Sequence, residues 1–169
     1  MLSKKLLDAL NEQLNKEYYS SYLYLSMAAY FDDKNLQGMA GWMRLQANEE
    51  HLHAMKFFDF IIRVGGRVKL GAIGEPAIEW NSPQSAFENA LEHEKFITKS
   101  IYDLVEKAVS EKEYSTQTFL NWFVDEQVEE EETVNTIVEK FKMIGDSASG
   151  LYMLDNELGS RSAASAASE

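Results

Sequence analysis

The sequence predicts an all-α fold in which four long helices form a bundle and a short fifth helix follows. Apolar residues recur at steps of three and four through four long segments, as on the buried face of a helix. Only Pro76 and Pro83 interrupt the 169 residues, so long helices are permitted. Each long segment also carries a polar residue near the middle of its apolar face, which predicts one shared polar layer.

The helix boundaries follow from start and stop signals. Ser82 and Pro83 are a typical N-cap and first helical residue, and we expect Asn35 to cap the second helix. Gly65 and Gly145 are typical of the position just after a helix. The expected helices, in chain order, span residues 3–32, 36–64, 83–112, 115–144 and 147–158.

The segment 65–82 between the second and third helices shows no helical period, and it is long for a connection inside a compact domain. A helix of about 28 residues is about 42 Å long. An extended segment of this length reaches roughly 60 Å. The connection can therefore cross the whole bundle, so that the second and third helices run parallel, which a short loop would not permit.

Composition excludes several classes of function. The net charge is −12, from 28 acidic and 16 basic residues, so the surface repels nucleic acid and anionic membranes and attracts cations. Cysteine is absent, which excludes disulfides, zinc–thiolate sites and thiol catalysis. We find neither a signal-peptide pattern nor an apolar run long enough to span a membrane, and we expect a cytoplasmic protein.

We expect one domain, residues 1–159, because this length is enough to bury a sizeable core. Residues 160–169 are rich in serine and alanine and carry no apolar period. We expect this tail to be disordered, and its composition is also typical of a sequence appended for expression.

The polar layer can be placed by counting residues from the turns. Glu17 and Glu50 lie nearly equidistant from the first turn, so they face each other in an antiparallel helix pair. Glu94 and Gln127 are likewise equidistant from the turn between the third and fourth helices. The expected layer consists of Glu17, Glu50, His53, Glu94, Gln127 and Glu130.

Four carboxylates in an apolar core repel one another unless something neutralises them. Two divalent cations would do so, and carboxylates with one imidazole suit iron or manganese better than zinc. Bundles of this type use a Glu from each of two helices and Glu-x-x-His from the other two. Glu50-x-x-His53 fits that pattern, whereas Gln127-x-x-Glu130 lacks the second histidine. The second metal is therefore expected to be held loosely, which suits iron in transit better than a permanent cofactor.

Three stretches of the chain resemble the non-haem ferritins of bacteria and archaea, which are ferritin-like di-iron four-helix bundles. The stretches are 17–25 (EYYSSYLYL), 49–56 (EEHLHAMK) and 122–131 (WFVDEQVEEE), and the resemblance extends over residues 3–158. It implies an iron-storage shell of 24 subunits, with the fifth helix at the four-fold axes. It also implies a ferroxidase that oxidises Fe(II) to Fe(III) with O2 or H2O2 and deposits the product as mineral inside the shell.

The resemblance further implies roles for individual residues. The ligands of a first iron would be Glu17, Glu50 and His53. A second iron would be bound by Glu94 and Glu130, with Glu50 as a bridge and Gln127 close by. A third iron would be bound by Glu49, Glu126 and Glu129, with Glu130 shared. Tyr24 and Trp122 match aromatic residues beside the centre that can donate electrons.

Two alternatives to a storage ferritin stay open. A di-iron oxidase or peroxidase, similar to rubrerythrin or bacterioferritin, would retain its metals. Bacterioferritins carry Glu-x-x-His on both helices and bind haem, and Gln127 departs from that pattern, so we predict no haem. A metal-free helical assembly module is the other alternative, and it leaves the buried carboxylates unexplained.

Several polar residues beside the layer are expected to be bystanders. His51 and His93 point about 100° away from the layer residues next to them, which favours a place on the surface or at an interface. Glu131 and Glu132 belong to a run of charges that is typical of a solvated helix face.

Overall fold

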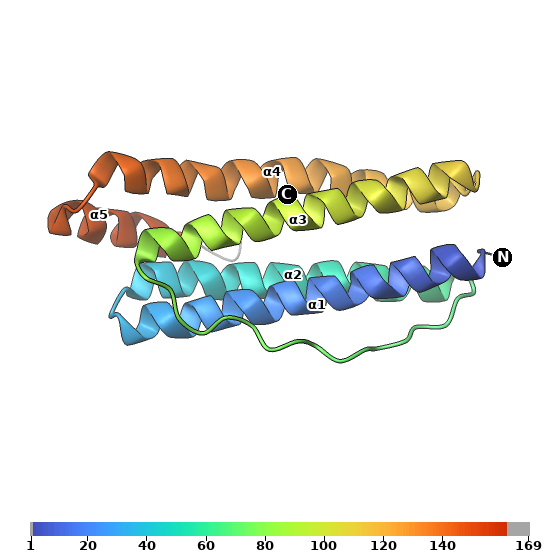
Figure 1. Ribbon diagram of the computed structural model, residues 1–169, viewed down its shortest axis with the longest axis horizontal. Coiled ribbons are helices and arrows are strands. Elements are labelled where there is room, and N and C mark those ends of the chain that lie inside the picture. The colour runs from blue at the N-terminus through green and yellow to red at the C-terminus, as the bar shows by residue number, and fades with distance from the viewer. Residues whose placement is uncertain (1, 162–169) are drawn as a thin grey trace.

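The computed structural model describes residues 2–161, which form five helices and no strand within that range (Figure 1). The helices are α1 (Lys4–Asp33), α2 (Gln37–Arg63), α3 (Pro83–Ser110), α4 (Tyr114–Ile144) and α5 (Ala148–Gly159). The predicted all-α fold is confirmed, and each boundary agrees with the expected one to within two residues. None of these helices combines the length and the apolar character that crossing a membrane requires.

Serine side chains begin three of the helices. The hydroxyls of Ser3, Ser82 and Ser147 each accept a hydrogen bond of 3.1 Å from the backbone N–H three residues later. The prediction that Asn35 caps α2 is wrong, because Leu36 takes that position without a side-chain bond. Asn35 instead adopts φ 59° in the turn after α1, a left-handed conformation that asparagine tolerates better than most residues.

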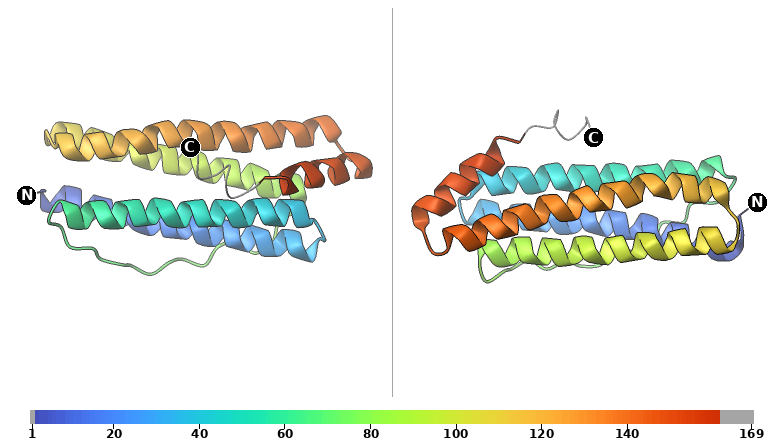
Figure 2. Two further views of the ribbon diagram at one scale, coloured as in Figure 1. Left: turned by 180° about the vertical axis from the view of Figure 1, so that it is seen from behind. Right: turned by 90° about the horizontal axis from the view of Figure 1, so that it is seen from above.

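The long connection makes α2 and α3 parallel, as the sequence predicted. In Figure 1, α1 and α2 form an antiparallel pair, and the segment after α2 returns along the outside of the bundle to the end where α3 begins. The two further views in Figure 2 show the same path. The bundle therefore consists of two antiparallel pairs, α1 with α2 and α3 with α4, joined by this crossover.

Side chains of α1 hold the crossover in place. The Asn11 amide donates to the carbonyl of Arg67 at 3.2 Å, and its oxygen accepts from the N–H of Lys69 at 2.6 Å. Farther along, Asn15 and Ser26 donate to two more backbone carbonyls of the crossover. These bonds satisfy backbone groups that would otherwise need a strand partner, so the segment stays extended without forming a sheet.

The apolar core is divided into two clusters with the polar layer between them. The cluster near α5 includes Phe31, Trp42 and Phe87, and the cluster at the opposite end includes Phe57 and Phe123. All five side chains are at most 2% exposed. The residues between the clusters are therefore shielded from water on both sides, although they are polar.

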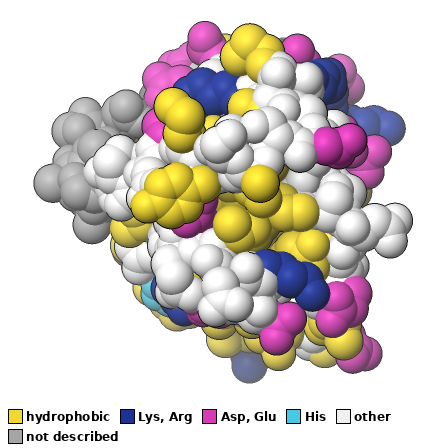
Figure 3. All heavy atoms as spheres, turned by 90° about the vertical axis from the view of Figure 1, so that its left-hand side faces the viewer, with side chains coloured by type: hydrophobic (Ala, Val, Ile, Leu, Met, Phe, Trp, Pro, Cys, Tyr) yellow, Lys and Arg dark blue, Asp and Glu magenta, His cyan; other side chains and the backbone are white. Residues whose placement is uncertain are grey.

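The α5 helix folds back against the start of α2 and buries Leu154 and Leu158. The same end of the molecule leaves Met143, Tyr152 and Met153 exposed on α4 and α5. Figure 3 looks at this end and shows hydrophobic side chains gathered near its centre. An exposed group of this kind is typical of a surface that another subunit covers.

The structure describes two residues beyond α5. Ser160 is the C-cap of α5, and the side chain of Arg161 contacts α2. These two residues belong to the segment 160–169 that was expected to be a disordered tail, and that expectation stays a prediction. The rest of the predicted tail, 162–169, lies outside the described residues.

Replacing Gly38 with alanine should lower the free energy of unfolding by about 1–3 kcal/mol. A Cβ at this position would lie 1.7 Å from the backbone oxygen of Asp155, so α5 would have to move away from α2. Chemical denaturation followed by circular dichroism measures the change. Gly41→Ala is the matched control, because nothing lies within 4 Å of a Cβ there. Equal destabilisation by both substitutions would contradict this account of the α2–α5 contact.

Candidate metal centre

The six polar residues that the sequence places in one layer lie together at the middle of the bundle. They are Glu17 on α1, Glu50 and His53 on α2, Glu94 on α3, and Gln127 and Glu130 on α4. Each is only 1–6% exposed. Four carboxyl groups and one imidazole are therefore held inside an apolar core, where unneutralised charge is costly.

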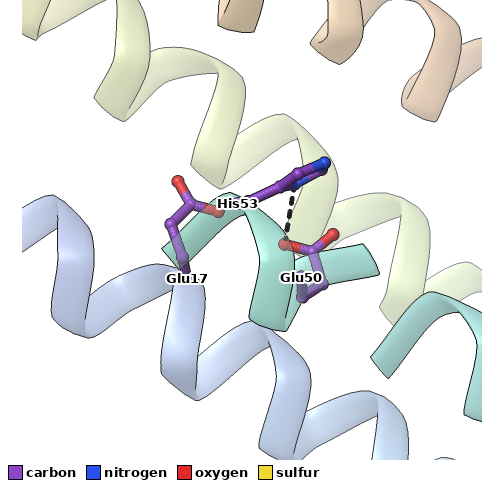
Figure 4. Close-up of side chains that lie close together, drawn as sticks. All are labelled: Glu17, Glu50 and His53. Carbon is purple, nitrogen blue, oxygen red and sulfur yellow. Dashed lines mark ion pairs between the residues drawn. The ribbon is translucent and has the colours of Figure 1, made fainter. Parts of the chain in front are cut away.

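Three of these residues converge on one point. Glu17, Glu50 and His53 each offer a ligand atom, and these atoms lie within 4.8 Å of one another. Figure 4 shows the Glu17 side chain reaching from α1 toward the Glu50 and His53 side chains of α2. The dashed line joins His53 Nδ1 to Glu50 Oε2, which are 3.4 Å apart.

Two polar atoms of this group lack hydrogen-bond partners among the described residues. They are Glu50 Oε1 and His53 Nδ1, and both are buried. Buried polar atoms are nearly always satisfied in folded proteins, so each such exception calls for an explanation. Two carboxylates and an imidazole nitrogen at this spacing are a donor set that fits a first-row divalent metal such as iron.

A second group of possible ligands lies on the other side of the imidazole. His53, Glu126 and Glu130 also offer one atom each within 4.8 Å of one another. His53 Nε2 is 3.7 Å from Glu126 Oε1. The sequence predicted Glu126 as a ligand of a third iron, and its closeness to His53 was not foreseen.

Glu94 is held by hydrogen bonds instead of lying in either group. The Tyr24 hydroxyl donates to Glu94 Oε1, and the Gln127 amide donates to Glu94 Oε2 at 3.2 Å. Gln127 also donates to Thr98 Oγ1 at 3.3 Å. Both oxygens of the Glu94 carboxylate are thus fixed in direction within the buried layer.

Comparison with known proteins shows the family of this chain. The family described as the ferritin-like domain matches residues 7–144. The chain belongs to the ferritin family. It is 43% identical over 162 residues to the bacterial non-heme ferritin of Staphylococcus epidermidis, covering 96% of this chain and 98% of that protein. The corresponding ferritin of Staphylococcus aureus is 41% identical over 161 residues, covering 95% and 97%.

Solved structures of archaeal ferritins share a larger part of the sequence. The open-pore ferritin of the archaeon Archaeoglobus fulgidus superposes with a TM-score of 0.95 at 53% identity, covering 95% of this chain and 98% of that one. A form of the A. fulgidus ferritin engineered to be closed gives 0.94 at 54% identity, covering 96% and 99%. The resemblance stated from the sequence is confirmed, and with it the assignment to iron storage.

The three predicted ligands of a third iron differ in their surroundings. Glu126 lies in the group with His53 and Glu130. Both carboxylate oxygens of Glu49 accept hydrogen bonds from Arg161, at 2.9 and 3.0 Å. Glu129 is exposed on this ferritin and belongs to neither group within residues 2–161. The set assigned by resemblance is therefore only partly assembled.

Two buried glutamines support the layer and were missing from the predicted site. Gln13 donates to Glu17 Oε1 at 2.7 Å, and Gln46 donates to Glu130 Oε2 at 2.9 Å. Gln13 lies four residues before Glu17 on the same helix face, which is the signal that identifies it. Gln46 likewise lies four residues before Glu50. Each amide thus holds one oxygen of a layer carboxylate in place.

Burial makes the carboxyl groups of the layer weak acids when no metal is bound. It raises the pKa of Glu17 and raises that of Glu50 well above the ordinary value. The pKa of Glu94 rises to about 6, mainly through burial. The pKa of Glu130 rises to about 8 through burial and then repulsion by Glu94. A metal that binds here must displace protons, so acid should weaken its binding.

The pKa values of His53 and His93 shift in opposite directions. Burial lowers the pKa of His53, but the carboxylates of Glu50, Glu126 and Glu17 outweigh it, so the pKa lies well above its ordinary value. Burial alone lowers the pKa of His93 to about 4, which keeps the ring neutral beside Ser20. His51 is exposed, as expected of a bystander.

Of the two glutamates expected to be solvated, Glu132 is exposed. Glu131 is half-buried, and its Oε1 accepts a hydrogen bond of 2.5 Å from Thr98. The prediction for Glu131 holds only in part, because its half-buried side chain also bonds to α3.

Proposed function

We propose that this protein is a ferroxidase that loads its own iron store. Fe(II) binds as a substrate in the polar layer, O2 or H2O2 oxidises it to Fe(III), and the product forms mineral inside a shell of 24 subunits. Two Fe(II) ions held side by side supply two electrons to one O2. The pair therefore reduces O2 to the level of peroxide without releasing a one-electron product.

The observation that carries this proposal is the convergence of Glu17, Glu50 and His53. Their ligand atoms lie within 4.8 Å of one another in a region shielded from water, and two of the polar atoms have no hydrogen-bond partner within residues 2–161. Family membership supports iron as the metal. We assign the first iron to these three residues, with Glu50 positioned to bridge to a second.

The second iron is assigned to Glu94 and Glu130, beside Gln127. The Gln127 amide donates hydrogen bonds and replaces the histidine of a symmetric di-metal site, so this iron should be held less tightly than the first. Tyr24 donates to Glu94, which supports a role in positioning that ligand and in donating an electron close to the metal. A loosely held iron can leave as Fe(III), as a storage function requires.

The mass of the native assembly before and after aerobic loading with Fe(II) tests this function. We expect an empty shell of 24 subunits that gains many iron atoms per subunit. A small oligomer that keeps two irons per subunit and forms no mineral would instead indicate a di-iron oxidase or peroxidase. An assembly that takes up no metal at all would overturn the proposal.

Three expectations stay predictions. The peripheral third iron at Glu49, Glu126 and Glu129, with Glu130 shared, is supported by the closeness of Glu126 to His53 and Glu130. The absence of haem and the cytoplasmic location follow from the sequence pattern and are untested.

A further inference from the structure

Arg161, two residues after α5, lies close to the metal centre. This residue follows α5, which folds back on α2 and brings the guanidinium against the outer side of α2. One of its nitrogens donates to both oxygens of Glu49, and the other donates to Gln46 Oε1. Its Cζ atom also lies 5.1 Å from the centre of the Trp42 ring. Three residues on successive turns of α2 therefore hold one cation.

This cation is connected to the buried layer. Gln46 accepts from Arg161 and donates to Glu130 Oε2 at 2.9 Å, so the two residues form a chain that ends on a proposed iron ligand. Glu49 adds negative charge at the same place, because it precedes Glu50 on α2 and the same guanidinium bonds to both Glu49 and Gln46. We call Glu49, Glu126 and Glu130 the edge carboxylates.

The Arg161–Glu49 ion pair contributes electrostatically and does more than attach α5 to the bundle. The Arg161 and Glu49 side chains are only 21% and 14% exposed, so their attraction is weakly screened. Other contacts attach α5 to the bundle, including buried Leu154 and the hydrogen bond of 2.8 Å from the Met39 N–H to Asp155. Arg161 is therefore not required to hold α5 in place.

We propose that Arg161 is an internal cation that occupies Glu49 among the edge carboxylates and competes with iron for it. A carboxylate whose two oxygens both accept from a guanidinium cannot bind a metal ion until those bonds break. The Arg161 charge also repels an approaching cation. Arg161 thereby controls when an iron beyond the first two can bind. This inference rests on the proposed function, since it concerns the order in which the same substrate fills its positions.

Anaerobic Fe(II) binding to the assembled, metal-free protein tests the inference. In Arg161→Ala, Fe(II) bound beyond the first two equivalents per subunit should bind about tenfold more tightly than in the parent. The first two equivalents should bind as before. The gain should vanish when Glu49→Gln is combined with Arg161→Ala, because the freed carboxylate is what attracts the metal. Arg161→Lys should give a smaller gain, because lysine keeps the charge without the two-pronged geometry.

Lys140→Ala is the matched control. Lys140 pairs with Glu157, so this substitution removes a different ion pair between α4 and α5. An equal gain in Lys140→Ala would show that a loosened α5 is the cause, and would overturn the inference. Unchanged binding in Arg161→Ala would overturn it as well, while leaving the proposed function intact. A parent protein that fails to bind even two Fe(II) per subunit would instead contradict the proposed function itself.

Discussion

Replacing Glu50 with glutamine should slow aerobic Fe(II) oxidation about 100-fold or more. Glu50 is the residue assigned to both irons, and its Oε1 atom has no other partner within residues 2–161. An amide has nearly the same shape as the carboxyl group, but it lacks the charge that two Fe(II) ions need. The initial rate of Fe(III) formation, followed by absorbance after Fe(II) is mixed with metal-free protein in air, measures the effect.

Asp59→Asn is the control for this substitution. Asp59 lies on the same helix, is exposed, and is separated from Glu50 by more than two turns, so its variant should oxidise iron at the parental rate. Both variants should assemble to the parental mass. If Glu50→Gln assembled normally and oxidised iron as fast as the parent, the assignment of Glu50 as the bridging ligand would be wrong.

The fold could be predicted because its determinants are local. Apolar periodicity, Ser82 with Pro83, and glycines after two helices mark the helices, and the length of the crossover sets their direction. The layer could be predicted for a related reason: a carboxyl group on an apolar helix face is conspicuous in the sequence. Counting residues from the turns then places the polar residues at one height.

The residues that were missed depend on contacts that the sequence does not display. The spacing of Gln13 and Gln46 from the layer glutamates puts them on the same helix faces, but only the structure shows which carboxylate each amide contacts. Arg161 lies in a segment with the composition of a tail, and its role depends on α5 folding back along α2. Asn35 was assigned as a cap from its residue type, but its backbone turns left-handed and Leu36 begins the helix.

The metal-free protein should lose stability as the pH rises from about 5 to 8. In the unfolded chain a glutamate titrates near its ordinary value of 4.5, whereas in the folded state Glu94 titrates at about 6 and Glu130 at about 8. Between these values the folded protein keeps protons that the unfolded chain has released, so each rise in pH favours unfolding. His53, whose pKa is also raised, acts in the same direction above pH 6.5. The combined loss should amount to several kcal/mol per subunit.

Bound metal should reverse this dependence, because a divalent cation replaces the protons and neutralises the carboxylates. Denaturation midpoints measured with a chelator should fall across this pH range, and those measured with redox-inert Zn(II) should not. Glu130→Gln removes a carboxyl group whose pKa is raised to about 8 and should flatten the metal-free curve, whereas Glu132→Gln, an exposed neighbour, should leave it unchanged. A metal-free midpoint that rose from pH 5 to 8 would mean that the layer is already ionised and neutralised without metal. The electrostatic reason for placing iron there would then be lost.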